Sequence, residues 1–203
     1  MEQINIINMS ICPRKQASTW EKIMMDKLNL PIKMPKIKKG MWLHWIKPAP
    51  NCLKLNVDGA FKDTMGAVGG ILRDEHGNFK MAFWGKVDTN SIDETEIRAV
   101  MVGIEKCTGK GYTNISVETD SINTIKLINE GMHSYNLTYE ARKCKNPNFS
   151  YAKIYREQNH VADALAKNAK NGDNWDCTNL NQIPKDIRKL VYLDSLGLDY
   201  YRR

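Results

Sequence analysis

Leu53-Lys54-Leu55-Asn56-Val57-Asp58-Gly59-Ala60 carries the pattern around which the other predicted elements arrange. Its apolar and polar residues alternate with a period of two, which is typical of a strand that buries one face. Asp58 closes the polar set, and Gly59 ends the predicted strand. Rigid backbone therefore holds this carboxylate beside a residue small enough to let a ligand approach. A lone aspartate at a strand end usually faces water, so a role for Asp58 depends on acidic residues elsewhere in the chain.

The next segments predict an antiparallel meander followed by a helix. Residues 66–73 and 79–87 resemble two further strands, joined by short turns. Ser91-Ile92-Asp93-Glu94 has the spacing of a capping box, which begins a helix. Small residues at Ala99 and Gly103 would let that helix lie close to the sheet. Its buried stripe recurs at helical spacing: Ile97, Val100, Met101 and Ile104.

The second half of the chain predicts parallel strands and their crossover helices. Residues 114–120 form a strand that returns parallel to the first one, with Asp120 at its end and able to cap the helix over 121–130. A loop and a short helix follow over 133–145, then a fifth strand over 149–156. Asn159 caps a last helix over 161–170. The sequence thus predicts an α/β fold with a five-stranded mixed sheet, three antiparallel strands followed by parallel ones, flanked by helices.

Four acidic residues occupy matched places in this arrangement: Asp58, Glu96, Asp120 and Asp163. Asp58 and Asp120 lie on strands that the crossover makes neighbours, whereas Glu96 and Asp163 lie in the first turns of two helices. Carboxylates gathered in one place repel each other unless a cation or a proton intervenes. Oxygen-only ligands favour Mg²⁺ or Mn²⁺ over zinc.

The N-terminal part of the chain differs from the rest in charge. Residues 1–50 hold nine Lys or Arg against three Asp or Glu, so most of the net charge of +7 lies there. We expect a poorly structured basic extension over 1–41 and one domain, with its C-terminal tail, over 42–203. The basic segment is either a phosphate contact or a solvated linker. Trp42 and Trp45 are expected to dock the lead-in on the domain, with base stacking as the alternative.

Composition excludes several classes of protein. There is no run of 18 apolar residues, so we expect no membrane span. The sequence also gives no sign of an obligate protein partner. The N-terminus lacks the pattern of a signal peptide. Five cysteines without a CxxC pair indicate free thiols in a reducing compartment, nucleus or cytoplasm.

Five motifs, in order, resemble the ribonuclease H family, and most closely the ribonuclease H-like domain of plant non-LTR retroelement polyproteins. They are Lys-Leu-Asn-Val-Asp-Gly-Ala-Phe (54–61), Gly-Gly-Ile-Leu-Arg-Asp (69–74), Glu-Thr-Glu-Ile-Arg-Ala (94–99), Val-Glu-Thr-Asp-Ser (117–121) and Tyr-Arg-Glu-Gln-Asn-His-Val-Ala-Asp-Ala-Leu-Ala (155–166). The resemblance covers about residues 42–200.

This resemblance implies an endonuclease that hydrolyses the RNA strand of RNA–DNA hybrids by a two-metal mechanism, with two Mg²⁺ ions or Mn²⁺ as a substitute. It implies that Asp58, Glu96, Asp120 and Asp163 are the catalytic, metal-binding residues, with Asp58 bridging both ions. Gly59, Ala60, Asn123 and Lys153 are the implied substrate contacts.

The chain departs from the family at one position. Lys153 stands where the family often has a histidine ten residues before the last aspartate, and a lysine does not shuttle protons near neutral pH. His160 is a candidate replacement. We therefore expect reduced cleavage, and the alternative is a weakly active or inactive nucleic-acid-binding module derived from a retroelement.

Overall fold

The computed structural model describes residues 23, 27, 40–130, 141–142, 144–169 and 175–202, with only the backbone of Trp175. Residues 41–202 belong to one compact unit. The predicted extension over 1–41 lies almost wholly outside the described residues, as does most of the predicted loop and short helix over 133–145.

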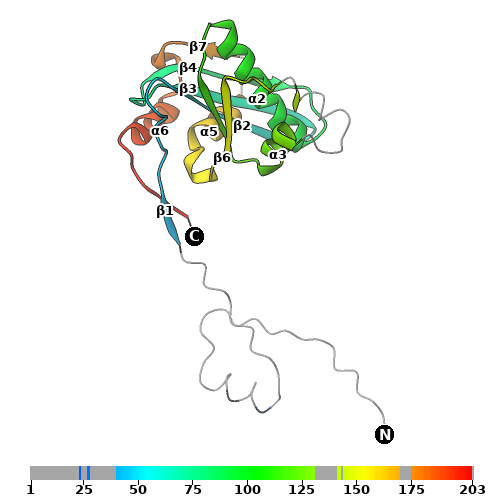
Figure 1. The fold of residues 1–203 in the computed structure, drawn as a ribbon. Helices are drawn as coiled ribbons and strands as arrows, with labels where there is room; N and C mark the ends of the chain where they lie inside the picture. Colours follow the sequence, from blue (N-terminus) through cyan, green and yellow to red (C-terminus); the bar gives the residue numbers. More distant parts are fainter. Residues whose placement is uncertain are drawn as a thin grey trace. The chain divides into compact units, whose positions relative to one another are not determined.

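A six-stranded mixed sheet forms the centre of this unit, in the order β6-β5-β2-β3-β4-β7 (Figure 1). The antiparallel meander consists of β2 (Leu53–Lys62), β3 (Met65–Arg73) and β4 (Phe79–Val87). On one side, β5 (Ile115–Thr119) and β6 (Phe149–Lys153) run parallel to β2 and to each other. The fold class is as predicted, but the sheet has a sixth strand. β7 (Trp175–Cys177) pairs antiparallel with the outer edge of β4 and is too short to show an alternating pattern.

Each face of the sheet has its own apolar core. The side chains of Leu55 and Val57 pack with α2 (Ile92–Gly109) and α3 (Ile122–Glu130). The opposite face, through Ala67 and Ile71, packs with α5 (His160–Asn168) and α6 (Lys185–Ser195). Lys54, Asn56 and Asp58 alternate with the first set, so they point to the α5 face. Gly103 lets α2 lie close to the sheet, since a Cβ there would stand 2.9 Å from Leu55 Cδ2.

Helix caps are partly as predicted. Ser91 Oγ accepts from the Glu94 amide at the start of α2. Asp120 does not cap α3, because Ser121 Oγ accepts the Thr124 amide instead. Asn159 precedes α5 but makes no side-chain cap; its Nδ2 donates to the Val57 carbonyl oxygen of β2 at 2.9 Å. The predicted caps by Asp120 and Asn159 were therefore wrong, and the Asn159 side chain bonds the sheet instead of the helix end.

The segment before β2 pairs with the C-terminal segment of the described residues. β1 (Met41–Leu43) and β8 (Tyr200–Arg202) form an antiparallel ribbon that extends beyond the main sheet (Figure 1). Trp45 is 1% exposed and docks the lead-in as expected, whereas Trp42 is 66% exposed and its ring lies tilted against that of Tyr201. The 3-10 turns η1 (Arg156–Gln158) and η3 (Leu180–Gln182) precede α5 and α6.

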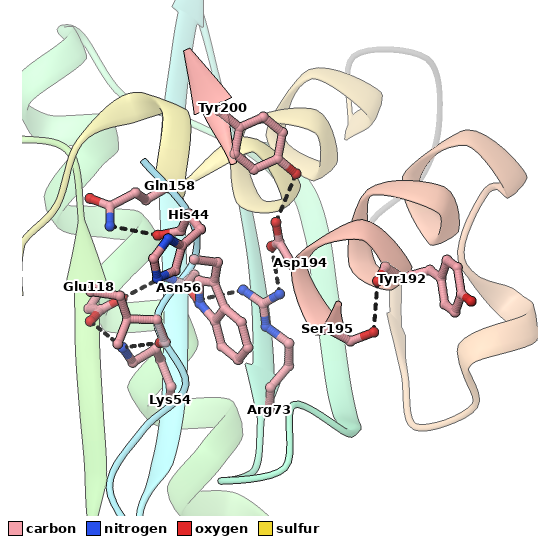
Figure 2. Close-up of polar contacts among 12 residues, drawn as sticks. His44, Lys54, Asn56, Arg73, Glu118, Gln158, Tyr192, Asp194, Ser195 and Tyr200 are labelled. Atoms are coloured by element: carbon pink, nitrogen blue, oxygen red, sulfur yellow. Dashed lines mark hydrogen bonds and ion pairs between the residues drawn. The ribbon is translucent and has the colours of Figure 1, made fainter. Parts of the chain in front are cut away.

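A buried polar network joins the lead-in, the sheet and α6 around Arg73 (Figure 2). The Arg73 guanidinium donates to Asp194 Oδ2 at 2.7 Å and to Asn56 Oδ1 at 2.8 Å. It also lies 3.5 Å from the centre of the Trp45 ring. Asn56 donates to Glu118, which pairs with Lys54 at 2.6 Å. Burial lowers the pKa of Arg73, and the Asp194 carboxylate opposes that shift.

Within the described part of the chain, no helix combines the length and apolar character needed to cross a bilayer.

Candidate metal centre

Three carboxylates from separate elements meet at one end of the sheet. Asp58 lies on β2, Glu96 in the first turns of α2 and Asp120 directly after β5. Each offers an oxygen, and these oxygens lie within 4.8 Å of one another. Asp58 and Glu96 are 4% and 8% exposed, whereas Asp120 is half-buried. The cluster therefore opens to solvent on the Asp120 side.

Close contact between β2 and α2 brings Glu96 to the cluster. A Cβ at Gly59 would stand 2.7 Å from the Glu96 amide nitrogen and 2.9 Å from its Cα, so only glycine fits. The Gly59 amide in turn donates to Glu96 Oε2 at 3.2 Å. Thr119 Oγ1, from the last residue of β5, lies 3.5 Å from the same oxygen. These contacts from β2 and β5 thus hold one carboxylate oxygen of Glu96 in place.

Burial and neighbouring carboxylates raise the pKa values of Asp58 and Glu96. Burial, followed by the charges of Glu96, Asp120 and Asp163, raises the pKa of Asp58 to about 9, and a hydrogen bond with Asp120 adds to the shift. Burial and the charge of Asp120 raise the pKa of Glu96 to about 8, against the hydrogen bond from Gly59. Without a cation, this cluster holds protons at neutral pH.

Asp163 approaches the cluster but stands outside the set of three. It is 8% exposed and lies in the first turn of α5. Its Oδ1 pairs with Arg156 Nη2 at 3.2 Å, and its Oδ2 pairs with Lys167 Nζ at 2.5 Å. Sequence reasoning missed both cations. Lys167 follows Asp163 by four residues in a helix, and this spacing indicates an ion pair. Arg156 reaches Asp163 because the η1 turn reverses the chain between them, and no sequence pattern indicates that contact.

Asn159 ties the two elements that carry Asp58 and Asp163. It is 1% exposed, its side chain bonds the residue before Asp58, and its carbonyl oxygen accepts from the Asp163 amide at 3.1 Å. A side-chain hydrogen bond from Asn159 therefore links β2 to the start of α5.

The four predicted substrate contacts lie around this end of the sheet. Gly59 and Ala60 continue β2 past Asp58. Asn123 is exposed and donates to Asp93 Oδ1 at 3.2 Å. Lys153 is exposed at the end of β6, paired with Thr119. The His160 ring stacks edge-on against Tyr200, 4.8 Å between centroids, so it is engaged with the C-terminal strand.

The cluster fits a hard divalent cation. Its donors are all carboxylate oxygens, the ligands that Mg²⁺ and Mn²⁺ prefer, and two of them are buried with strongly raised pKa values. A bound cation would replace the protons that otherwise relieve the repulsion.

Comparison with known protein families shows which family this chain belongs to. The model of the family described as reverse transcriptase-like matches residues 56–169, more than half of the 203 residues. The chain belongs to the reverse transcriptase-like family. The matched segment contains Asp58, Glu96, Asp120 and Asp163, and it leaves out β1, α6 and β8.

Solved structures show that this reverse transcriptase-like chain has the ribonuclease H fold. RNase H1 from the archaeon Halobacterium salinarum NRC-1 superimposes with a TM-score of 0.56 at 20% identity, over 60% of this chain and 98% of that one. The N-terminal RNase H domain of a Mycobacterium tuberculosis protein gives 0.52 at 18% identity, over 59% and 93%. LC11-RNase H1, isolated from compost and solved with an RNA/DNA hybrid, gives 0.53 at 18% identity, over 58% and 95%. No curated protein sequence matches this member of the family.

Proposed function

We propose that this chain is a Mg²⁺-dependent endonuclease that hydrolyses the RNA strand of RNA–DNA hybrids. The observation that carries the proposal is the meeting of Asp58, Glu96 and Asp120 within 4.8 Å, two of them buried. A carboxylate cluster of this kind is costly to bury without a cation to bind. The ribonuclease H fold, and a structural relative bound to an RNA/DNA hybrid, support the choice of substrate.

Some residues of the site would bind the metal ions, and others position the residues that bind them. Asp58, Glu96 and Asp120 would hold one divalent ion, and Asp58 with Asp163 a second. When bound, the ions supply Lewis-acid activation of a water nucleophile and neutralise charge at the scissile phosphate. Thr119 and the Gly59 amide orient Glu96, whereas Asn159 sets the distance between β2 and α5. Glu96 would also contact a ribose 2′-hydroxyl, which selects RNA as the cut strand.

Cleavage of an end-blocked hybrid tests the proposal. We expect the wild-type chain with Mg²⁺ to cut the RNA strand internally and leave 5′-phosphate ends, and EDTA to stop the reaction. Asp58→Asn should lower the rate at least about 100-fold, since one charged ligand of the metal is lost. Asp186→Asn is the matched control, because that aspartate is 91% exposed on α6. Equal rates for wild type and Asp58→Asn would refute the proposal.

A nucleic-acid-binding module with little turnover is the second candidate. Two observations favour it: Asp163 is engaged by two cations, and Lys153 replaces the usual histidine. Its signature would be hybrid binding by the wild type and by Asp58→Asn with no cleavage by either. For both candidates we propose an origin in a plant non-LTR retroelement, supported by the sequence motifs alone.

A further inference from the structure

Two cations flank an exposed tyrosine next to the carboxylates. Lys153 Nζ lies 4.3 Å from the centre of the Tyr155 ring, and the Arg202 guanidinium carbon lies 4.7 Å from it. Tyr155 is 37% exposed, Lys153 is exposed, and the Arg202 side chain is 40% exposed, so all three reach solvent. With Arg156, the next residue, these side chains make up the cation–aromatic cluster: Lys153, Tyr155, Arg156 and Arg202. Aromatic rings hold cations in place without neutralising them.

Two members of the cation–aromatic cluster adjoin residues next to the candidate metal centre. Lys153 is the register partner of Thr119, the residue before Asp120. Arg156 bonds Asp163 directly at 3.2 Å. A polyanion whose backbone passes over the carboxylates would therefore meet these positive charges next.

Arg202 comes from a different part of the chain. It lies in β8, outside the segment matched by the family model. Its Nη1 pairs with Glu157 Oε2 at 2.8 Å, and this ion pair holds the guanidinium beside η1. A guanidinium carries five N–H donors in a planar fork, so donors remain that suit a phosphate. The ribbon thus delivers a pre-positioned cation to the edge of the site.

We propose that the cation–aromatic cluster binds backbone phosphates of a nucleic acid held at the carboxylates, with Arg202 as a contact supplied from outside the family-matched segment. This inference rests on the proposed function. Phosphates are the ligand class, because fixed guanidinium and ammonium groups at an exposed site recognise the repeating charge of a nucleic-acid backbone.

Salt-dependent binding tests the cluster. The full chain carrying Asp58→Asn is titrated with a fluorescent RNA–DNA hybrid by anisotropy, from 50 to 200 mM KCl. We expect Arg202→Ala and Lys153→Ala each to weaken binding roughly threefold or more at low salt. Each should also reduce the slope of log K against log salt by about 1, one phosphate contact fewer. Lys189→Ala, on α6 and paired with Asp186, is the control and should change neither quantity.

Glu157→Gln separates phosphate contact from structural support. It breaks the same ion pair as Arg202→Ala but keeps the cation, so we expect unchanged or tighter binding. If Glu157→Gln weakens binding as much as Arg202→Ala, Arg202 only supports the ribbon and the inference is wrong. Binding that is insensitive to Arg202→Ala and Lys153→Ala, or no binding by any variant, also overturns it. Cleavage by the wild type is scored separately, so loss of this inference and loss of the proposed function give different results.

Discussion

Asp58 and Glu96 hold protons that the unfolded chain would release. Their pKa values of about 9 and 8 lie far above the ordinary values of 3.8 and 4.5. A raised carboxyl pKa stabilises the folded state below the unfolded pKa, and that stability is lost as pH rises through the folded pKa. We therefore expect the melting temperature in EDTA to fall between about pH 5 and pH 9. Excess Mn²⁺ or Asp58→Asn should remove much of this fall, measured by thermal unfolding across the pH range. A melting temperature in EDTA that stays flat from pH 5 to 9 would contradict the buried-cluster account.

If Asp163 holds a metal ion as we propose, Lys167 would compete with that ion for the carboxylate. Its ammonium group occupies Oδ2 of that carboxylate, and it is 56% exposed, so the ion pair is weak. Lys167→Gln should tighten Mn²⁺ binding about two- to fivefold by calorimetry, because a competitor and a repelling charge are both removed. Lys189→Gln, which breaks the comparable pair with Asp186, should leave the affinity unchanged. Weaker binding in Lys167→Gln would show that the lysine orients Asp163 instead.

Single residues of the site were predictable where an element boundary fixes them. Glu96 near a helix start and Asp120 at a strand end were placed correctly, and the structure brings both together with Asp58. The prediction that Gly59 ends the first strand was wrong, because β2 continues to Lys62 and Asp58 lies inside it.

Of the two ion pairs of Asp163, the one with Lys167 follows from helical spacing. The one with Arg156 was not predictable, because Arg156 reaches Asp163 only through the η1 turn. The part played by Asn159 was misassigned, since a cap and a cross-link to β2 call for the same residue type.

At the level of elements, glycines set how closely helices approach the sheet. A Cβ at Gly69 of β3 would stand 2.7 Å from the Leu165 carbonyl carbon and 2.8 Å from the Ala162 carbonyl oxygen of α5, and would also contact the Ala166 amide. These are backbone atoms that cannot move alone. Gly69→Ala should therefore lower the free energy of unfolding by about 1–3 kcal/mol in urea. Gly109→Ala is the matched control.

Gly109 ends α2 in open space, because a Cβ added there would meet no atom of the described residues within 4 Å. Alanine at this position should therefore be neutral or stabilise the helix by about 0.5–1 kcal/mol. Equal effects of the two substitutions would mean that α5 does not pack on β3.

The strands and helices themselves were predictable from alternation, helical stripes and the Ser91 cap. β7 was not, because a three-residue edge strand has too few residues for a period.

At the scale of the whole molecule, Arg73 connects the segments that flank the family-matched core. Both Arg73 and Asp194 are nearly inaccessible, with side chains 1% and 2% exposed. Asp194→Ala leaves a buried unpaired guanidinium and should cost about 3–5 kcal/mol in the free energy of unfolding. Asp186→Ala, exposed on the same helix, should stay within about 0.5 kcal/mol of wild type. A small loss in Asp194→Ala would mean that α6 is not anchored through Arg73.

The sequence spacing of Ile187 and Val191, four residues apart, is that of one helix face, and both side chains are buried against the domain. The sequence did not predict that Asp194 reaches Arg73, some 120 residues earlier, nor that β8 pairs with β1. Such long-range polar contacts leave no periodic signal, because each depends on the completed packing of the other elements.

Crystals of the chain soaked in Mn²⁺ and measured at an anomalous wavelength address the central claim, that distant carboxylates converge to hold a divalent ion. We predict an anomalous peak bounded by Asp58, Glu96 and Asp120, absent from crystals of Asp58→Asn. Strong Mn²⁺ peaks elsewhere, with none among these three side chains, would contradict the account.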